Sequence, residues 1–427
     1  MIEPVRVFIL YARQDSAQRY RCQHLQQQLR LYGVTCHIGD IRRVSLAELS
    51  GCQFVIYHRV PSDRNVERQV RALRESGCIT LFDTDDLIFD QSLLNHINSL
   101  VKAAPIRICL YRREVELYRR LMEQVDGILV STDFLARQVA FLGKPVQVHR
   151  NAFSLEMYAA SSAALMQQQR DSRKTIIGYA SGTPTHDQDF QVIKPVLQQL
   201  LLEHREIELQ IIGHLDPGNG WGKTQSRIRH LPFVSWQELP GLLSGFDINL
   251  APLEIDNPFC QAKSEIKYVE AGLVRIPTIA SRTDAYSYAI QHGINGLLAS
   301  THQEWLDCLE QLVENVKLRQ AMGGRAYQDV QACYQPIVRG RELIQMLNEF
   351  SLPILGQELF PVISLPDLST TRNNDPGPGS VAAPSLWLRF WYALRFRPPG
   401  MLLMQILFYL RKRLKKVTEH RADLTGN

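Results

Sequence analysis

Two runs of alternating strand and helix patterns constrain the fold of this chain more than any other feature. The first run has strand-like apolar segments at 5–12, 52–60, 78–82, 127–131 and 145–149, and helical patterns at 17–32, 65–75, 111–124 and 133–141. The second has strand-like segments at 175–179, 207–213, 231–234, 247–253 and 276–280, and helical patterns at 190–203, 236–244, 263–274, 302–315 and 317–334. Repeated βα units predict parallel, doubly wound sheets. We therefore expect an α/β protein with two Rossmann-like domains that face each other across a crevice.

Changes in composition set the expected domain boundaries. A stretch rich in Ala, Ser and Gln follows the first run and carries no strand pattern, which is typical of a connection between domains. After the second run and one further helical pattern, Pro, Gly, Ser and Asn accumulate, which predicts a flexible linker. The expected units are a first domain at 1–153, a connection at 154–173, a second domain at 174–335, a helix at 336–351 that could return to the first domain, a linker at 352–384 and an amphipathic tail at 385–427.

Composition and cysteine usage indicate a folded intracellular protein. Hydrophobic residues make up 45% of the chain and charged residues 21%, as in soluble globular proteins. The eight cysteines are scattered without a Cys-x-x-Cys pair, which argues against a disulfide framework or a zinc site. No signal-peptide pattern precedes the first strand, and no apolar run reaches the roughly 20 residues of a membrane-spanning helix. We therefore expect a cytoplasmic protein.

The basic charge of the chain is concentrated in the tail. Residues 385–417 hold eight of the 48 basic residues and no acidic one, and without them the 43 acidic residues are in excess. Aromatic residues interleaved with Arg, ten uncharged residues at 401–410 and a basic cluster at 411–416 predict a helix lying in an anionic membrane interface. The protein would then bind the inner face of the membrane peripherally. A partner-binding helix pair or a docked arm is the alternative, whereas nucleic acid is not an expected partner because the body offers no basic face.

A charged stripe on the helix expected at 263–274 is the first candidate site. Lys263, Lys267 and Glu270 fall on one face at positions i, i+4 and i+7. Because this helix follows a parallel strand, its N-terminal end and the two ammonium groups favour an anionic ligand such as a phosphate. A solvated, salt-bridged helix face is the alternative explanation.

A glycine-rich loop after the first strand of the second domain is a further candidate for phosphate binding. Gly182 would let the backbone approach a ligand closely, and Ser181, Thr183 and the following helix N-terminus offer donors for phosphate oxygens. The loop matches neither a P-loop nor Gly-x-Gly-x-x-Gly. An ordinary βα loop with an aspartate as helix cap is the alternative.

Several segments occur in the order of a known family. They are Arg-Asn-Ala-Phe at 150–153, the glycine-rich loop, Ile-Ile-Gly-His at 211–214, Leu-Pro-Phe-Val at 231–234, Phe-Asp-Ile-Asn-Leu-Ala-Pro-Leu at 246–253, the helix that carries Glu270, then Pro277, and His-Gly-Ile-Asn-Gly-Leu-Leu at 292–298. In this order the chain resembles the retaining glycosyltransferases of family 4, which have the GT-B fold. The resemblance covers residues 1–335 and is strongest over 176–298.

The resemblance implies a hexosyl-type transferase that moves a sugar from a nucleotide diphosphate sugar on the second domain to an acceptor on the first, with retention. Glu270 looks like the carboxylate with which this family holds the donor's ribose hydroxyls. Neither a cofactor nor a bound metal is implied, and the tail suggests a glycan, lipid-linked or other envelope acceptor. The residues expected to bind the donor are Gly182, Thr183, His186, Gly213, His214, Phe233, Val234, Lys263, Lys267 and Glu270.

The sequence departs from this family at three points. Ala262 stands where the family has the first carboxylate of its Glu-x7-Glu motif, and Arg275 stands where a glycine usually follows. The basic pair of the first donor-side loop is also missing. We infer that Lys263 and Lys267 supply the positive charge for the diphosphate instead.

The first domain supplies the remaining candidates. The segment 81–90 gathers four aspartates, which could bind a divalent metal, cap a helix or hold acceptor hydroxyls at the end of a strand. His58 ends another strand and is either a catalytic group or a packed or solvated histidine. We predict catalytic roles for His58, Asp85 and Asp86, and acceptor contacts for Arg19, Arg21 and Arg59.

A second function is compatible with these features. Loss of the family's first carboxylate fits a non-catalytic GT-B subunit that binds a nucleotide or a glycan at the membrane. A Rossmann dehydrogenase is set aside because its Gly-x-Gly-x-x-Gly fingerprint is missing. The sugar, the base, the acceptor and the oligomeric state are left open by the sequence.

Overall fold

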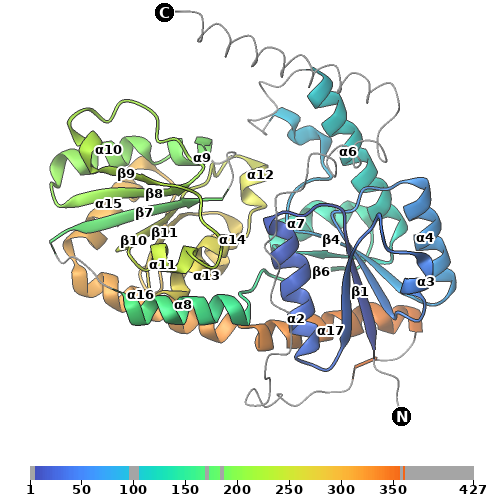
Figure 1. Cartoon of the computed structure of the whole chain (residues 1–427). Coiled ribbons are helices and arrows are strands. Elements are labelled where there is room, and N and C mark those ends of the chain that lie inside the picture. The colour runs from blue at the N-terminus through green and yellow to red at the C-terminus, as the bar shows by residue number, and fades with distance from the viewer. Residues whose placement is uncertain (1–4, 96–104, 169–172, 183–186, 356–358, 361–427) are drawn as a thin grey trace, which may run out of the picture.

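The computed structural model describes residues 5–95, 105–168, 173–182, 187–355 and 359–360, which form two α/β domains side by side (Figure 1). This confirms the predicted pair of Rossmann-like domains. The amphipathic tail expected at 385–427 lies outside the described residues, as do Thr183 and His186. None of the described helices combines the length and apolarity that crossing a membrane requires.

The first domain is built on a parallel six-stranded sheet in the order β2-β1-β3-β4-β5-β6. Its central strands β3, β4 and β5 are buried along their whole length, which explains why they read as continuous apolar runs. The edge strand β2 was not predicted, because only two of its six residues are buried. The strands are β1 (Arg6–Tyr11), β2 (Thr35–Asp40), β3 (Phe54–His58), β4 (Ile79–Thr84), β5 (Gly127–Val130) and β6 (Val146–Val148).

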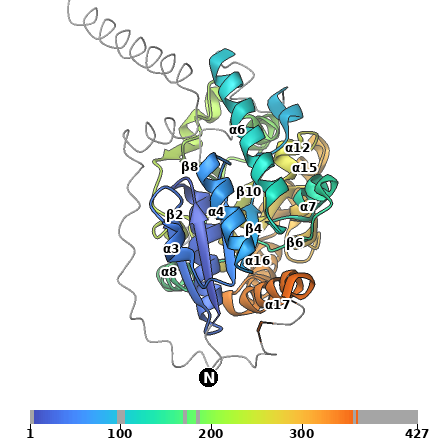
Figure 2. The ribbon, with the colours of Figure 1, turned by 90° about the vertical axis from the view of Figure 1, so that its right-hand side faces the viewer.

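Helices cover both faces of the first sheet. Buried residues of α4, α6 and α7 form one apolar cluster with the sheet, and those of α2 and the C-terminal helix α17 (Pro336–Leu355) form another on the opposite face (Figure 2). The helical segments of this domain are α1 (Ser16–Gln18), η1 (Arg19–Gln23), α2 (His24–Arg30), α3 (Leu46–Leu49), α4 (Arg64–Glu75), η2 (Gln91–Asn95), α6 (Pro105–Gln124), α7 (Asp133–Val139) and η3 (Ala140–Leu142).

The second domain repeats this plan with the strand order β12-β11-β10-β7-β8-β9, again fully parallel. The strand predicted at 231–234 is displaced, because the edge strand β9 carries polar residues and ends where the prediction begins. The strands are β7 (Thr175–Ser181), β8 (Ile207–Gly213), β9 (Ile228–Leu231), β10 (Ile248–Ala251), β11 (Thr278–Ser281) and β12 (Leu297–Ala299).

The helices of the second domain include one that the sequence did not predict. The Ala-rich connection expected at 154–173 forms α8, which begins where Ser154 Oγ accepts a hydrogen bond from the Met157 N–H at 3.1 Å. The helical segments are α8 (Leu155–Gln167), α9 (Asp187–Gln191), α10 (Lys194–Glu203), η5 (Gly222–Arg227), α11 (Leu239–Leu243), α12 (Pro258–Gln261), α13 (Ile266–Leu273), α14 (Asp284–Ala289), α15 (His302–Glu314) and α16 (Val316–Cys333).

The helix that carries Glu270 is shorter than predicted. It was expected to begin at Lys263, but α13 begins at Ile266, so Lys263 lies in the turn that joins α12 to α13. The chain bends there because the turn meets the first domain, where Asn151 Nδ2 donates to Ser264 Oγ at 2.9 Å. Lys267 and Glu270 still share one helix face, and Lys263 reaches the same region from the preceding turn.

The C-terminal helix α17 (Pro336–Leu355) leaves the second domain and packs beneath the first sheet (Figure 1). Its Leu343, Leu347 and Phe350 are buried in the same cluster as α2. Gly127 makes this approach possible, since a Cβ there would lie 2.3 Å from the Phe350 ring. The helix therefore belongs to the core of the first domain.

Truncating α17 inside this core should destabilise the first domain. Leu347 is fully buried, so Leu347→Ala should lower the free energy of unfolding by about 2–5 kcal/mol, as expected for a core leucine. Leu352 lies on the same helix but is 44% exposed, and Leu352→Ala should change it by less than about 0.5 kcal/mol. Urea unfolding of both variants measures the difference, and equal effects would contradict this packing.

Candidate functional site

Many of the predicted site residues lie near the point where the strand order of each sheet reverses. The order reverses between β1 and β3 in the first sheet and between β7 and β10 in the second. At such a point the loops on neighbouring strands leave in opposite directions, which is where doubly wound sheets bind ligands. The first-domain candidates follow β1, β3 and β4, and the second-domain candidates follow β7, β8 and β9 or lie near α13.

A buried charge network stands at the switch point of the first sheet. Asp83 at the end of β4 accepts hydrogen bonds from Arg21, whose Nε lies 3.2 Å from both carboxylate oxygens. His58 Nδ1 lies 2.7 Å from the other side of the same carboxylate. Burial raises the pKa of Asp83, but Arg21 and His58 outweigh it, and the pKa lies well below its usual range. The carboxylate is therefore ionised and holds the imidazole in a fixed orientation.

Arg21 does not occupy the acceptor-binding position that the sequence predicted. Its side chain is fully buried, and Nη1 donates to the carbonyl of His149 at 2.5 Å and to Asn151 Oδ1 at 3.3 Å. The π-helical segment η1 adds a residue to the helical turn and directs Arg21 into the domain. Arg21 therefore ties β4 to the end of β6 and positions His58 through Asp83.

Arg59 joins two further aspartates of this region, Asp85 and Asp86. Its Nη2 lies 2.5 Å from Asp85 and 3.1 Å from Asp86, and its backbone has a φ of 45°. This left-handed conformation costs a non-glycine residue about 1–3 kcal/mol and is found most often at functional sites. Burial raises the pKa of Asp86, although Arg59 and the ammonium of Lys263 oppose the rise. Lys263 of the second domain thus lies close enough to act on an acid of the first.

Two cations meet at the switch point of the second sheet. The ammonium of Lys267 donates to the carbonyl of Ala180 at the end of β7 and lies 4.9 Å from the centre of the Tyr179 ring. Burial lowers the pKa of Lys267 to about 8, and Glu270 opposes that effect. Lys263 Nζ lies 3.7 Å from Asp189 on α9. The Lys267 ammonium group therefore lies at the end of β7 and remains largely protonated at neutral pH, and Lys263 lies beside α9.

An exposed aromatic pair lies at the ends of the next two strands. The rings of His214 and Phe233 stack with centroids 4.8 Å apart and planes 20° apart, and Phe233 is 55% exposed. Gly213, directly before His214, adopts a φ of 102°, and a Cβ there would lie 2.0 Å from the carbonyl oxygen of Ser181. Val234 packs against the neighbouring apolar cluster. A flat apolar surface of this kind suits a nucleobase.

Residues that the sequence did not single out join the two domains at Glu270. Tyr20 of η1 donates from its hydroxyl to Glu270 Oε1 at 2.5 Å, across the domain junction. Arg19 lies over the Trp236 ring of the second domain, 4.9 Å from its centre. The sequence signal that could have identified Tyr20 is its position between Arg19 and Arg21, which were predicted to contact the acceptor. The structure thus brings the predicted acceptor residue Arg19 next to the predicted donor residue Glu270.

A second part of the junction surrounds the start of α13. Arg150 lies 3.5 Å from the buried carboxylate of Glu265, which also accepts a hydrogen bond from Tyr334 at 2.8 Å. The guanidinium covers the Tyr288 ring at 3.3 Å from its centre. These contacts join the end of the first domain to α13 and so fix the orientation of the helix that carries Glu270.

Two of the three departures from the family pattern have a structural explanation. Ala262 is fully buried against the first domain, and its carbonyl accepts a hydrogen bond from Thr132 at 3.4 Å. A carboxylate at this position would lose its hydration, so a small apolar residue fits. Arg275 follows α13 with a φ of 59°, which is the conformation that favours glycine at a helix end. Its guanidinium lies 4.9 Å from the centre of the Tyr327 ring.

A group of metal-type ligands also lies near Lys263. The ligand atoms of Asp189, Glu254 and Cys260 are within 4.8 Å of one another. Cys260 Sγ lies 3.2 Å from Asp189, and burial raises the pKa of its thiol. The ammonium of Lys263 already lies beside this group, so its charge opposes that of an added cation.

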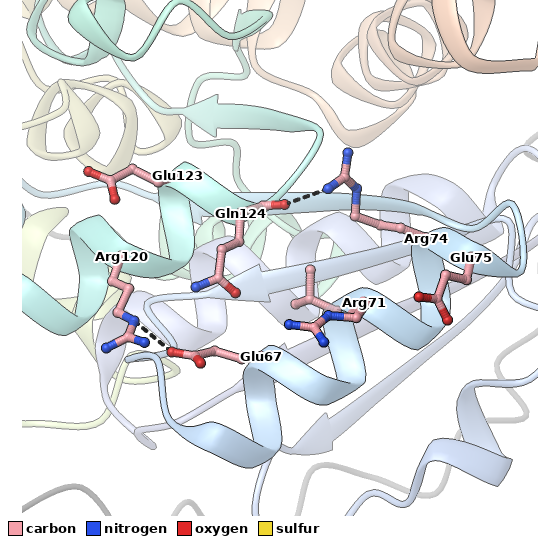
Figure 3. A pocket seen from close by; sticks show the side chains of 8 residues that line it. Glu67, Arg71, Arg74, Glu75, Arg120, Glu123 and Gln124 are labelled. Carbon is pink, nitrogen blue, oxygen red and sulfur yellow. Dashed lines mark hydrogen bonds and ion pairs between the residues drawn. The ribbon is translucent and has the colours of Figure 1, made fainter.

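A hollow of about 710 Å³ lies on the first domain between α4 and α6, away from the second domain (Figures 1 and 3). Its charged side chains form ion pairs, with Arg120 Nε 2.7 Å from Glu67 and Arg74 Nε 2.7 Å from Asp126. Figure 3 shows Arg120 of α6 beside Glu67 of α4, and Arg74 of α4 donating to the backbone carbonyl of Gln124 on α6. They hold the two helices together, and the hollow contains none of the predicted site residues.

Comparisons with known proteins bear on the same region. Residues 192–345 match the family model described as "Glycosyl transferase-like". No curated protein sequence matches the chain.

Solved structures share the two-domain arrangement. A sucrose-phosphate synthase from Thermosynechococcus elongatus has 11% identity and a TM-score of 0.57, and the match covers 81% of this chain and 98% of that one. The Anabaena protein HepE in complex with UDP has 12% identity and a TM-score of 0.56, with 81% and 100% covered. A glycosyltransferase from Rickettsia africae has 12% identity and a TM-score of 0.57, with 82% and 99% covered.

Identities this low show a common fold. Each match covers more than four fifths of this chain and almost the whole of the solved chain, so the common fold includes both six-stranded sheets. The chain therefore has the two-domain GT-B fold, and residues 192–345 are similar to the glycosyl transferase-like family.

Proposed function

We propose that this protein is a glycosyltransferase that takes a sugar from a uridine diphosphate sugar bound to its second domain. The observation that carries the proposal is the position of Lys263, Lys267 and Glu270. They gather beside the end of β7, at the switch point of a domain that matches a glycosyl transferase-like model. HepE, which has the same fold, was solved with UDP. The fold supports the nucleotide by analogy, and the residues support it by their chemistry.

Each group has a separate role in this proposal. The His214–Phe233 pair offers a stacking surface for the base, and Glu270 accepts hydrogen bonds from the ribose hydroxyls. Lys263 and Lys267 face the diphosphate. When the bond between sugar and phosphate breaks, negative charge grows on the leaving diphosphate. Fixed cations at that point stabilise the transition state more than the ground state.

The first domain is proposed to hold the acceptor. Asp85 and Asp86 are partly exposed at the end of β4, where they can accept hydrogen bonds from acceptor hydroxyls. His58 is oriented by Asp83 and is proposed to act on the acceptor hydroxyl. A hexosyl donor, a glycan or lipid-linked acceptor and retention of configuration are proposals from the family resemblance.

One observation favours a second function. Ala262 replaces the family's first carboxylate and is fully buried at the junction, so a contact of the transferred sugar is missing. A GT-B subunit that binds the nucleotide or a glycan without transferring sugar would tolerate this loss. Binding without turnover distinguishes this function from catalysis.

Release of UDP from uridine diphosphate sugars tests the proposal. Purified protein should bind UDP and liberate it from at least one such donor. Glu270→Gln removes the charge that accepts the ribose hydroxyls and should weaken UDP binding by about tenfold or more. Glu314→Gln on the exposed end of α15 is the matched control and should bind as the parent does. Calorimetry measures the binding, and a coupled UDP assay measures the release.

The outcomes separate three possibilities. Binding and release that both depend on Glu270 support the transferase. Binding that depends on Glu270 without release from any donor, in the presence of glycan and lipid acceptors, favours the non-catalytic subunit. Absence of UDP binding, or binding unchanged by Glu270→Gln, rules out the donor site as placed.

We further propose that residues 385–427 bind the protein to an anionic membrane surface. The eight basic residues at 385–417 and the aromatic side chains among them support it. The full chain should sediment with vesicles containing phosphatidylglycerol, and a chain ending at residue 384 should stay in the supernatant. Neutral phosphatidylcholine vesicles serve as the control. Equal sedimentation of both chains would contradict a lipid-binding tail.

A further inference from the structure

Tyr20 is a first-domain residue whose ring is buried in the second domain. It belongs to η1, yet it packs in an apolar cluster with Phe153, Leu253 and Tyr268 and is only 8% exposed. A π-helical segment is rare and is often found at functional sites. In this chain, η1 turns Arg21 into the first domain while Tyr20 contacts the second.

The hydroxyl of Tyr20 links an arginine to the carboxylate of Glu270. Arg19 Nη2 donates to the Tyr20 hydroxyl at 3.1 Å, and that hydroxyl donates to Glu270 Oε1 at 2.5 Å. The Arg19 guanidinium lies 4.6 Å from the centre of the Tyr20 ring and 4.9 Å from that of Trp236. Hydrogen bonds to an ionised carboxylate are roughly twice as strong as neutral ones. The contact is therefore a firm connection between the domains.

The hydrogen bond from Tyr20 occupies a carboxylate oxygen of Glu270 that the ribose of the proposed donor would also contact. A ribose carries hydroxyls at its 2′ and 3′ positions, and a carboxylate receives both most effectively when its two oxygens are available. In the structure, one of the two oxygens of Glu270 already accepts a hydrogen bond from Tyr20. A tyrosine hydroxyl and a ribose hydroxyl offer the same donor chemistry, so they compete for the same acceptor.

We propose that Tyr20 controls nucleotide affinity by occupying Glu270 in the place of a ribose hydroxyl, so that donor binding must displace it. The inference rests on the proposed function, because it takes Glu270 as the ribose-binding carboxylate. Displacement breaks a contact between the domains, and nucleotide binding therefore favours an arrangement in which Tyr20 has left the second domain. The measured affinity is reduced by the fraction of protein in which Glu270 is free.

Replacing Tyr20 with Phe tests the competition while keeping the ring in its apolar cluster. Tyr20→Phe should bind UDP about tenfold more tightly than the parent, because the carboxylate no longer has a competing donor. Tyr118→Phe is the matched control. It removes another tyrosine hydroxyl of the first domain that donates to a glutamate, at 3.0 Å from Glu114, and should leave UDP affinity unchanged.

A ligand without ribose hydroxyls gives a second readout that a loss of packing would not change. The parent should bind UDP more tightly than 2′,3′-dideoxy-UDP, but by less than the full contribution of the two hydroxyls, since Tyr20 opposes part of the gain. In Tyr20→Phe the preference for UDP should rise by about the same tenfold, because the hydroxyls then bind an unoccupied carboxylate. Isothermal titration of both ligands against the parent, Tyr20→Phe and Tyr118→Phe gives all six constants.

Each outcome decides the proposal. Tighter UDP binding together with a larger ribose preference in Tyr20→Phe supports it. Weaker or unchanged UDP binding in Tyr20→Phe, with binding by the parent intact, overturns it while the proposed function stands. If Glu270→Gln binds UDP as the parent does, or no variant binds UDP at all, the donor site and this inference fall together.

Discussion

Parallel strand pairing is the constraint on which the arrangement of this protein depends. Every strand of both described sheets runs in the same direction as its neighbours. Each connection must therefore run back over one face of the sheet, and the C-terminal ends of all strands in a sheet lie on the same side. Polar residues that are distant in sequence therefore meet at the C-terminal ends of the strands. Because α17 returns to the first domain, these ends of both sheets face a common junction, and one site can take its residues from both domains.

The two sides of the junction use charge differently. In the first domain, Arg21 and Asp83 are fully buried and form an ion pair, and Asp83 also contacts His58. These contacts fix the positions of the three side chains. In the second domain, Lys263 and Lys267 remain partly exposed beside the start of the loop after β7. Buried pairs mainly set positions, whereas partly exposed cations can gain energy from an anion. This division is consistent with the proposal that the first domain holds the acceptor rigidly and that the second binds the diphosphate.

The sequence predicted the regular parts of this arrangement, since central parallel strands are apolar along their whole length and alternate with amphipathic helices. It missed the edge strand β2, because that strand is only partly buried. It also placed Lys263 on α13, whereas α13 begins at Ile266, after a turn that contacts the first domain. Helix periodicity alone does not predict this starting point. The sequence also does not predict that the Arg21 side chain points into the first domain. A π-helical segment shifts side chains around the helix axis, and no residue pattern in η1 predicts that this segment is π-helical. The same shift produced the Tyr20 contact with Glu270.

The central claim is that a nucleotide diphosphate binds at the switch point between β7 and β10. Hydrogen–deuterium exchange of the full chain with saturating UDP tests it most directly, because it reports where amides become protected. The account predicts slower exchange at 176–182 and 263–274, with no change in α4 and α6 around the hollow of the first domain. Protection confined to α4 and α6, or no protection in either segment at saturation, would contradict it.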